Sequence, residues 1–251
     1  MLKLFISNNR KNIIGIKVRG FFITIKNKKG NKMQKILKKV FALSTVILLV
    51  AILFVLFTSN QNFVADGNVQ DKNIELSDFN KLKISNDYYV VVQKSSDITT
   101  KPTCTITASA NVIDLIDVIV NNGELSIQNK KGKIFSSNDI KISLVISTLS
   151  SIEVNDETSV FVYSGDILTK SFDCEINDNA TLKMSDINID NLNCSMDNDG
   201  KFLMAGNGKV KNATIFAQKC SKFIATDLKI GRAVLNVNDQ AEVVADLSSM
   251  N

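Results

Sequence analysis

The sequence predicts an all-β fold: a right-handed parallel β-helix that follows one transmembrane helix. Three observations lead to this prediction: a repeat of 20–22 residues between residues 152 and 245, alternation of apolar and polar residues inside each repeat, and a long uncharged segment before it. Alternation with a period of two is typical of strands with one buried face. A fixed period near 20 residues indicates a solenoid, because one coil buries its apolar face only when neighbouring coils stack on it.

Each repeat contains two apolar pairs, and the second pair follows the first by eight residues. The first pairs are Ile152/Val154, Cys174/Ile176, Cys194/Met196, Ile215/Ala217 and Leu235/Val237, and the second pairs are Val160/Val162, Leu182/Met184, Phe202/Met204, Phe223/Ala225 and Val243/Ala245. Successive first pairs are 22, 20, 21 and 20 residues apart. Leu82/Ile84 and Val90/Val92 show the same offset, so we expect the β-helix to occupy residues 78–251 in about eight coils.

The remaining apolar residues and the turns predict the shape of a coil. A third apolar pair tends to follow the second, at Ile187/Ile189, Val210 and Leu228/Ile230, which indicates three short faces per coil. Asn or Asp occupies the turn after the first pair in four of five repeats, and both residues tolerate left-handed backbone angles. The repeat is less regular between residues 104 and 146, where Asn121-Asn122-Gly123 predicts a hairpin or a tight coil turn.

A membrane span is predicted for residues 40–57, eighteen consecutive residues without a charge. A helix of this length is about 27 Å long, close to the ~30 Å hydrocarbon core of a bilayer. Lys35, Lys38 and Lys39 precede the segment and uncharged residues follow it, so the positive-inside rule places the N-terminus in the cytoplasm and the later residues outside. A cleaved signal peptide is the competing interpretation, although the apolar stretch is long for one and no small-x-small site ends it.

Charge divides the chain into an arm and the rest. Residues 1–39 carry twelve Lys or Arg and no acid, whereas the remainder holds 18 basic and 25 acidic residues, a net charge of about −7. We expect a basic cytoplasmic arm at 1–39 and a linker at 58–77. Met33 opens a sequence typical of an exported protein, so residues 1–32 can reflect an upstream start codon assigned in error. The position of the arm favours anionic lipid headgroups, and no nucleic-acid partner is expected.

The sequence gives little support for a catalytic site or a metal-binding site. The chain has no histidine and no tryptophan, so we predict no enzyme and no cofactor. Asp156, Asp178 and Asp239 could present oxygens to calcium along one edge, but nearby lysines would neutralise them, and a row of solvated turns is the alternative. Cys174 and Cys194 occupy equivalent places in consecutive coils, about 4.8 Å apart. They form either a disulfide, in an oxidising compartment, or two small buried hydrophobes in the core.

These features together resemble the bacterial family of putative auto-transporter adhesin head domains, also called GIN head domains. The segment Thr105–Ile127 is similar to the early part of that family, and Leu149-Ser150-Ser151-Ile152-Glu153-Val154 resembles its step into the repeats. The resemblance covers roughly residues 78–247. The family's corner is typically Gly-Ser-Gly, which Asn-Asp replaces in most coils here. The resemblance implies an exported, surface or periplasmic domain with a right-handed β-helix.

The expected function is binding. We expect a membrane-anchored, extracytoplasmic, adhesion-like domain whose partners are a glycan, an envelope polymer or another protein. The alternative is a structural, self-assembling envelope protein, in which the open ends of the solenoid pair as a homo-oligomer. Neither the ligand nor the oligomeric state follows from the residues.

Overall fold

The computed structural model describes residues 3–5, 13–18, 21–26, 44, 61–97, 100–131, 133–135 and 140–246. They belong to two compact units, residues 1–59 and residues 60–251. In the first unit, β1 (Lys3–Phe5), β2 (Ile13–Val18) and β3 (Phe21–Lys26) form an antiparallel sheet. The predicted basic arm therefore contains a small sheet, which its alternating Ile and Phe residues can explain in retrospect.

The predicted membrane span at residues 40–57 lies outside the described residues, apart from Ser44, which is helical. Among the residues that are described, no helix is both long enough and apolar enough to cross a membrane. The span therefore stays a prediction.

Part of the expected linker, residues 58–77, forms strands in the second unit. β4 (Gln61–Phe63) pairs in parallel with β11 (Lys133–Phe135), and β5 (Val69–Glu75) pairs antiparallel with β8 (Thr103–Ser109). The side chains of β5 are mostly exposed. An edge strand of this kind needs few apolar residues, so its polar composition gave no strand signal.

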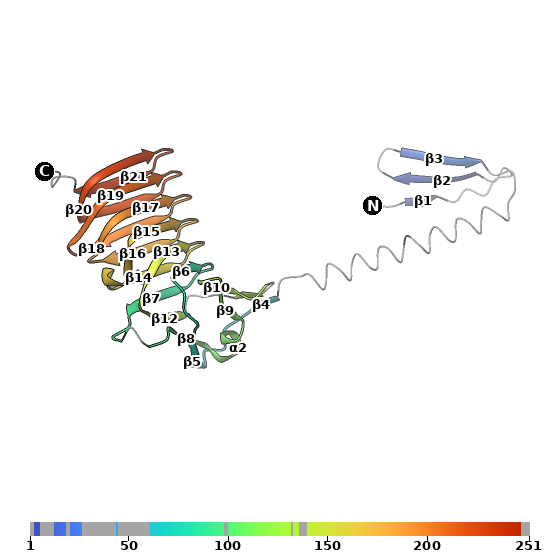
Figure 1. Cartoon of the computed structure of the whole chain (residues 1–251). Coiled ribbons are helices and arrows are strands. Elements are labelled where there is room, and N and C mark those ends of the chain that lie inside the picture. The colour runs from blue at the N-terminus through green and yellow to red at the C-terminus, as the bar shows by residue number, and fades with distance from the viewer. Residues whose placement is uncertain are drawn as a thin grey trace. The chain divides into compact units, whose positions relative to one another are not determined.

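The second unit is a solenoid of stacked parallel strands (Figure 1). The first column of strands contains β6 (Lys81–Ile84), β13 (Leu149–Val154), β15 (Leu168–Ile176), β17 (Asn188–Met196), β19 (Gly208–Ala217) and the second half of β20 (Lys222–Val237). The second column contains β7 (Tyr89–Lys94), β14 (Ser159–Val162), β16 (Thr181–Ser185), β18 (Lys201–Ala205), the first half of β20 and β21 (Glu242–Asp246).

The register confirms the repeat read from the sequence. In the first column Ile152, Cys174, Cys194, Ile215 and Leu235 are successive partners, and in the second column Val160, Leu182, Phe202, Phe223 and Val243 are. The third apolar position is also confirmed, because Ile189 pairs with Val210, which pairs with Ile230. The all-β solenoid is thus established, while its right-handed winding stays a prediction supported by the usual hand of parallel crossovers.

The number of coils is smaller than predicted. From Leu149 to Asp246 the chain makes about five regular turns rather than eight. Residues 95–148 leave the repeat and include α2 (Ala110–Ile113), β9 (Ile116–Asn121), β10 (Glu124–Asn129) and β12 (Lys141–Ile146). β9 and β10 form a hairpin at Asn121-Asn122-Gly123, which is one of the two alternatives predicted there. β10 and β12 then pair with β6 and β7 on the side away from β13 and β14, out of chain order.

The inward columns form one continuous core. Ile84, Val90, Ile176, Leu182 and Phe223 are each fully buried, and the Phe202 and Phe223 rings stack with centroids 4.7 Å apart. Each such side chain contributes about 1.5–3 kcal/mol through its removal from water. Stacked coils therefore supply the stability that one coil lacks.

The corner after the first column is a two-residue turn with left-handed backbone. Both central residues have positive φ in four consecutive coils, at Asp178/Asn179, Asn198/Asp199, Lys219/Cys220 and Asp239/Gln240. The amide of the following residue donates to the carbonyl three residues before it in each coil, as in a type I′ turn. Corner amides also donate to the next coil, so the ladder of hydrogen bonds continues around the bend.

Candidate binding face

Three aromatic side chains gather on the outer surface of the second column. Tyr89 on β7, Phe161 on β14 and Tyr163 just after β14 point away from the core, because their neighbours Val90, Val160 and Val162 point inward. We call the surface formed by Tyr89, Phe161 and Tyr163 the aromatic face. Tyr89 is 39% exposed and Tyr163 is 55% exposed. Exposed aromatic side chains that lie together are typical of binding surfaces.

The rings of the aromatic face contact one another. The centroids of Tyr89 and Phe161 lie 5.0 Å apart, with their planes inclined by 36°. Partial desolvation, together with the neighbouring Tyr163, raises the pKa of Tyr89 above its ordinary value. Val91, which points outward by alternation, is only 7% exposed. The cluster therefore covers an apolar floor.

A shallow groove runs along the aromatic face, with a volume of about 370 Å³. Tyr89, Val91 and Gln93 line it from β7, and Tyr163 lines it from just after β14. Thr107 lines it from β8, and Lys141 and Ser143 line it from β12. The groove thus combines aromatic rings with hydroxyl, amide and ammonium groups. This mixture suits a ligand that is itself both apolar and polar.

Two lysines flank the rings. The Nζ of Lys141 lies 5.9 Å from the ring centroid of Tyr89, and the Nζ of Lys183 lies 5.8 Å from that of Phe161. No salt bridge involves Lys141 or Lys183 in the described part of the chain. Asp71 accepts a hydrogen bond from the Thr107 hydroxyl, and Asp166 lies 3.7 Å from Lys94. The ammonium groups of Lys141 and Lys183 therefore place positive charge next to the rings.

The first column carries a different groove of about 450 Å³ on its outer surface. Its lining includes Glu124, Glu153, Asp173 and Glu175, with Phe216, which is 50% exposed. Lys83 lies 2.7 Å from Glu153. Burial alone would raise the pKa of Glu153, but hydrogen bonds from Lys83 and Asn155 lower it below its ordinary value. This groove is acidic, in contrast to the aromatic face.

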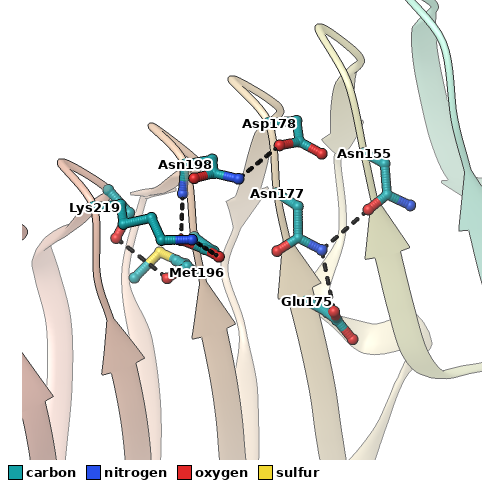
Figure 2. A network of polar contacts seen from close by, with 9 residues as sticks. Asn155, Glu175, Asn177, Asp178, Met196, Asn198 and Lys219 are labelled. Carbon is teal, nitrogen blue, oxygen red and sulfur yellow. Dashed lines mark hydrogen bonds and ion pairs between the residues drawn. The ribbon is translucent and has the colours of Figure 1, made fainter.

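The candidate calcium residues Asp156, Asp178 and Asp239 lie in the row of corner turns, each with positive φ, and Figure 2 shows Asp178 there. Asp156 accepts a hydrogen bond from the amide of Asn86, and Asp178 accepts one from the Nδ2 of Asn198 at 2.9 Å. Asn198 and Lys219 occupy the two coils between Asp178 and Asp239, so the register keeps those carboxylates roughly 14 Å apart. No group of three metal-ligating side chains occurs among the described residues. The geometry thus gives these residues a role in turns, and calcium binding is untested.

Asparagine side chains link successive coils beside this row. The Nδ2 of Asn177 donates to the Oδ1 of Asn155 at 3.0 Å and to the Oε1 of Glu175 at 3.1 Å (Figure 2). The Nζ of Lys219 lies 3.0 Å from the Oδ2 of Asp197 in the preceding coil. Such contacts satisfy polar groups that the bend exposes, as Asn ladders do in other stacked strands.

Cys174 and Cys194 are direct partners in the register, as their spacing predicted. Both are buried and both are free thiols. Burial raises the pKa of Cys174 well above its ordinary value, and the neighbouring Cys194 adds to this effect. The two residues therefore serve as unreactive members of the core.

The aromatic face was not predicted from the sequence. The available signal was the alternation of Phe161 and Tyr163, at outward positions, with the inward Val160 and Val162. Tyr89 gave less indication, because the adjacent Tyr88 is buried. Only the pairing of β7 with β14 brings Tyr89 and Phe161 side by side.

Comparison with known proteins finds one matching family model and several solved structures with a similar fold. A family model described as "Putative auto-transporter adhesin, head GIN domain" matches residues 78–246. A structure of a putative adhesin from Parabacteroides merdae superposes with a TM-score of 0.53 at 13% identity, covering 73% of this chain and 83% of that one. A putative adhesin from Parabacteroides distasonis gives 0.54 at 16% identity, covering 74% and 84%. A putative lipid binding protein from the same organism gives 0.52 at 16%, covering 74% and 97%.

At these identities the likeness shows a shared fold alone. Among curated proteins, none matches the chain.

Proposed function

The chain belongs to the family described as "Putative auto-transporter adhesin, head GIN domain", and from this premise we propose that it is a membrane-anchored, extracytoplasmic binding domain that works in adhesion. The aromatic face is the surface we assign to the ligand. The observation that carries this assignment is the exposure of Tyr89 and Tyr163 in one contiguous cluster. Tyrosine is among the residues that most often dominate binding energy.

Anchoring rests on the sequence of residues 40–57. The lysines before this segment and the uncharged residues after it support a cytoplasmic N-terminus and an external solenoid. The family name supports the same location for residues 78–246. Protease added to intact spheroplasts should digest the solenoid while a tag before residue 1 stays protected; protection of both ends would contradict this topology.

Binding without catalysis fits the composition. The chain lacks histidine, the side chain that most often acts as a general base at neutral pH. The corner carboxylates are engaged in turns, and the acidic groove has a lysine paired with Glu153. We assign neither groove an enzymatic role.

Attachment of cells that display the full chain tests the proposal. Changing Tyr89→Ala and Tyr163→Ala together should lower the fraction of cells retained on envelope polysaccharide by about tenfold, since it removes both exposed rings. Phe216→Ala is the matched control, because Phe216 is similarly exposed but lies on the other column. Equal retention of all three strains would show that the aromatic face is not the adhesive surface.

Self-assembly is a second candidate, supported by the last coil. Leu235 and Val237 occupy inward positions, yet they are 45% and 40% exposed, because no described residue stacks on them. An uncovered strand edge with apolar side chains invites pairing with another chain. Sizing of the full chain in detergent over a range of concentrations distinguishes self-assembly from a monomeric binding domain. Self-assembly predicts a particle size that grows with concentration, and Leu235→Lys should abolish this growth.

A further inference from the structure

We propose that the aromatic face binds an acidic saccharide, meaning a sugar chain that carries carboxylates, as hexuronates do. This inference rests on the proposed function and names the ligand class for the same surface. It follows from three features of the groove: its rings, its neutral polar groups and its positive charge.

The rings provide a platform for the apolar side of a sugar. The flat side of each aromatic ring carries partial negative charge, and the C–H groups on one side of a pyranose ring are weakly positive. Tyr89 and Tyr163 line the groove, and Phe161 packs against Tyr89 with the two ring planes inclined by 36°. The two lining rings offer a sugar ring an apolar surface on which to pack.

The neutral polar groups match sugar hydroxyls. Ser143 and Thr107 supply hydroxyls and Gln93 supplies an amide, so the groove offers both donors and acceptors. The Thr107 hydroxyl donates a hydrogen bond to the Oδ1 of Asp71 at 2.6 Å. Its oxygen is thereby oriented to accept a hydrogen bond from a ligand hydroxyl.

The charge selects an anion. Clusters of aromatic rings also bind methylated ammonium groups. Here Lys141 and Lys183 occupy positions near 6 Å from the ring centroids, and they would repel a cation. Carboxylates on a saccharide would be attracted to both lysines while the sugar ring packs on the aromatic side chains. The acidic groove on the first column would repel the same ligand, so the molecule itself offers a negative control.

The size of the groove is compatible with a short oligosaccharide. Its volume of about 370 Å³ falls in the range of roughly 300–1,000 Å³ typical of small-molecule sites. The row of outward residues continues from Phe161 to Lys183 and Leu203 in the next coils. A longer chain could therefore extend along the solenoid axis.

The test is titration of the full chain, purified in detergent micelles, with a trimer of galacturonic acid and with a neutral galactose trimer. Binding can be followed by tyrosine fluorescence, because the chain has no tryptophan and two of its three tyrosines lie on the aromatic face. We expect the acidic trimer to bind about tenfold more tightly than the neutral one at low salt, and the difference to shrink as salt screens the lysines.

Variants separate the contributions. Lys141→Gln with Lys183→Gln should abolish the preference for the acidic trimer, and Lys201→Gln, an exposed lysine of β18, should leave it unchanged. Tyr163→Ala should weaken both trimers by about tenfold or more, whereas Phe216→Ala should weaken neither. Melting temperatures within a few degrees of the parent chain confirm that each variant is folded.

The outcomes distinguish this inference from the proposed function. Equal affinity for the two trimers, or no binding of either, overturns the assignment of an acidic saccharide. If attachment of cells still depends on Tyr89 and Tyr163, adhesion through the aromatic face survives and its ligand belongs to another class. If attachment does not depend on them, the proposed function is wrong as well.

Discussion

Ile176 and Asp178 are two residues apart and have opposite surroundings. Ile176 is fully buried between Val154 and Met196 of the adjacent coils. Asp178 lies at the corner, with a φ of 55°, and accepts a hydrogen bond from Asn198. The chain therefore passes from core to solvent within one turn.

This contrast predicts the effect of single substitutions. Ile176→Asp should lower the free energy of unfolding by about 3–5 kcal/mol, because it buries a carboxylate without a partner. Asp178→Asn should change it by less than about 0.5 kcal/mol, because asparagine accepts the same backbone angles and hydrogen bonds. Chemical denaturation measures both, and equal losses would mean that the inward register is wrong.

The ion pair of Glu153 and Lys83 predicts a small pH dependence. The pKa of Glu153 is lowered in the folded chain, so its stabilising contribution is complete above the ordinary value of 4.5 and is lost as the pH falls further. Both side chains are about one-third exposed, at 30% and 40%, which limits the contribution to about 1 kcal/mol or less. Glu153→Gln should flatten the fall in melting temperature below pH 4.5; an unchanged slope would contradict the pairing.

Among the structural elements, the corner after the first column was the most predictable from the sequence. Asp178, Asn179 and Asn198 are residue types that adopt positive φ readily, and they do so. Lys219 and Cys220 adopt the same angles without that preference, because neighbouring coils impose them through the shared hydrogen-bond ladder. Stacking thus overrides local propensity in this coil.

Cys220 allows a direct test of the corner. Its φ is 62°, and its side chain is exposed. Cys220→Val should lower the free energy of unfolding by about 1–2 kcal/mol, because a β-branched side chain clashes with its own backbone at this angle. Cys220→Asn should be neutral or slightly stabilising. Thermal unfolding of the two variants provides the comparison, and a more stable valine variant would exclude a left-handed corner.

The strands themselves divide into predictable and unpredictable ones. Alternation placed Ile152, Cys174 and Cys194 in one column because a period of two fixes which face is buried. It could not show that β10 and β12 stack on β6 and β7 out of chain order, since alternation indicates a buried face and not the neighbour that covers it. The aromatic face depends on which strands lie next to one another, so it could not be predicted from the alternation.

For the whole molecule, the two ends of the solenoid differ. Beyond β12 and β10 the sheet continues into the antiparallel strands β8, β5 and β9, and α2 buries Val112 and Ile113. At the other end Leu235 and Val237 are partly exposed. Antiparallel strands and a helix close one end, whereas the described residues leave the other end available for pairing.

The whole-molecule arrangement also sets the aromatic face apart from the acidic groove. The two surfaces lie on different columns of the same solenoid, so one chain presents a positive aromatic surface and a negative one. A rigid stack of coils holds both in fixed positions. Binding at the aromatic face should therefore leave Phe216 and its surroundings unchanged.

Hydroxyl-radical footprinting of the displayed full chain, read by mass spectrometry, tests this account most directly. Oxidation of Tyr89 and Tyr163 should fall several-fold when displaying cells attach to envelope polysaccharide, while oxidation of Phe216 stays the same. Protection of Phe216 with no change at Tyr89 and Tyr163 would contradict the claim that the aromatic face holds the ligand.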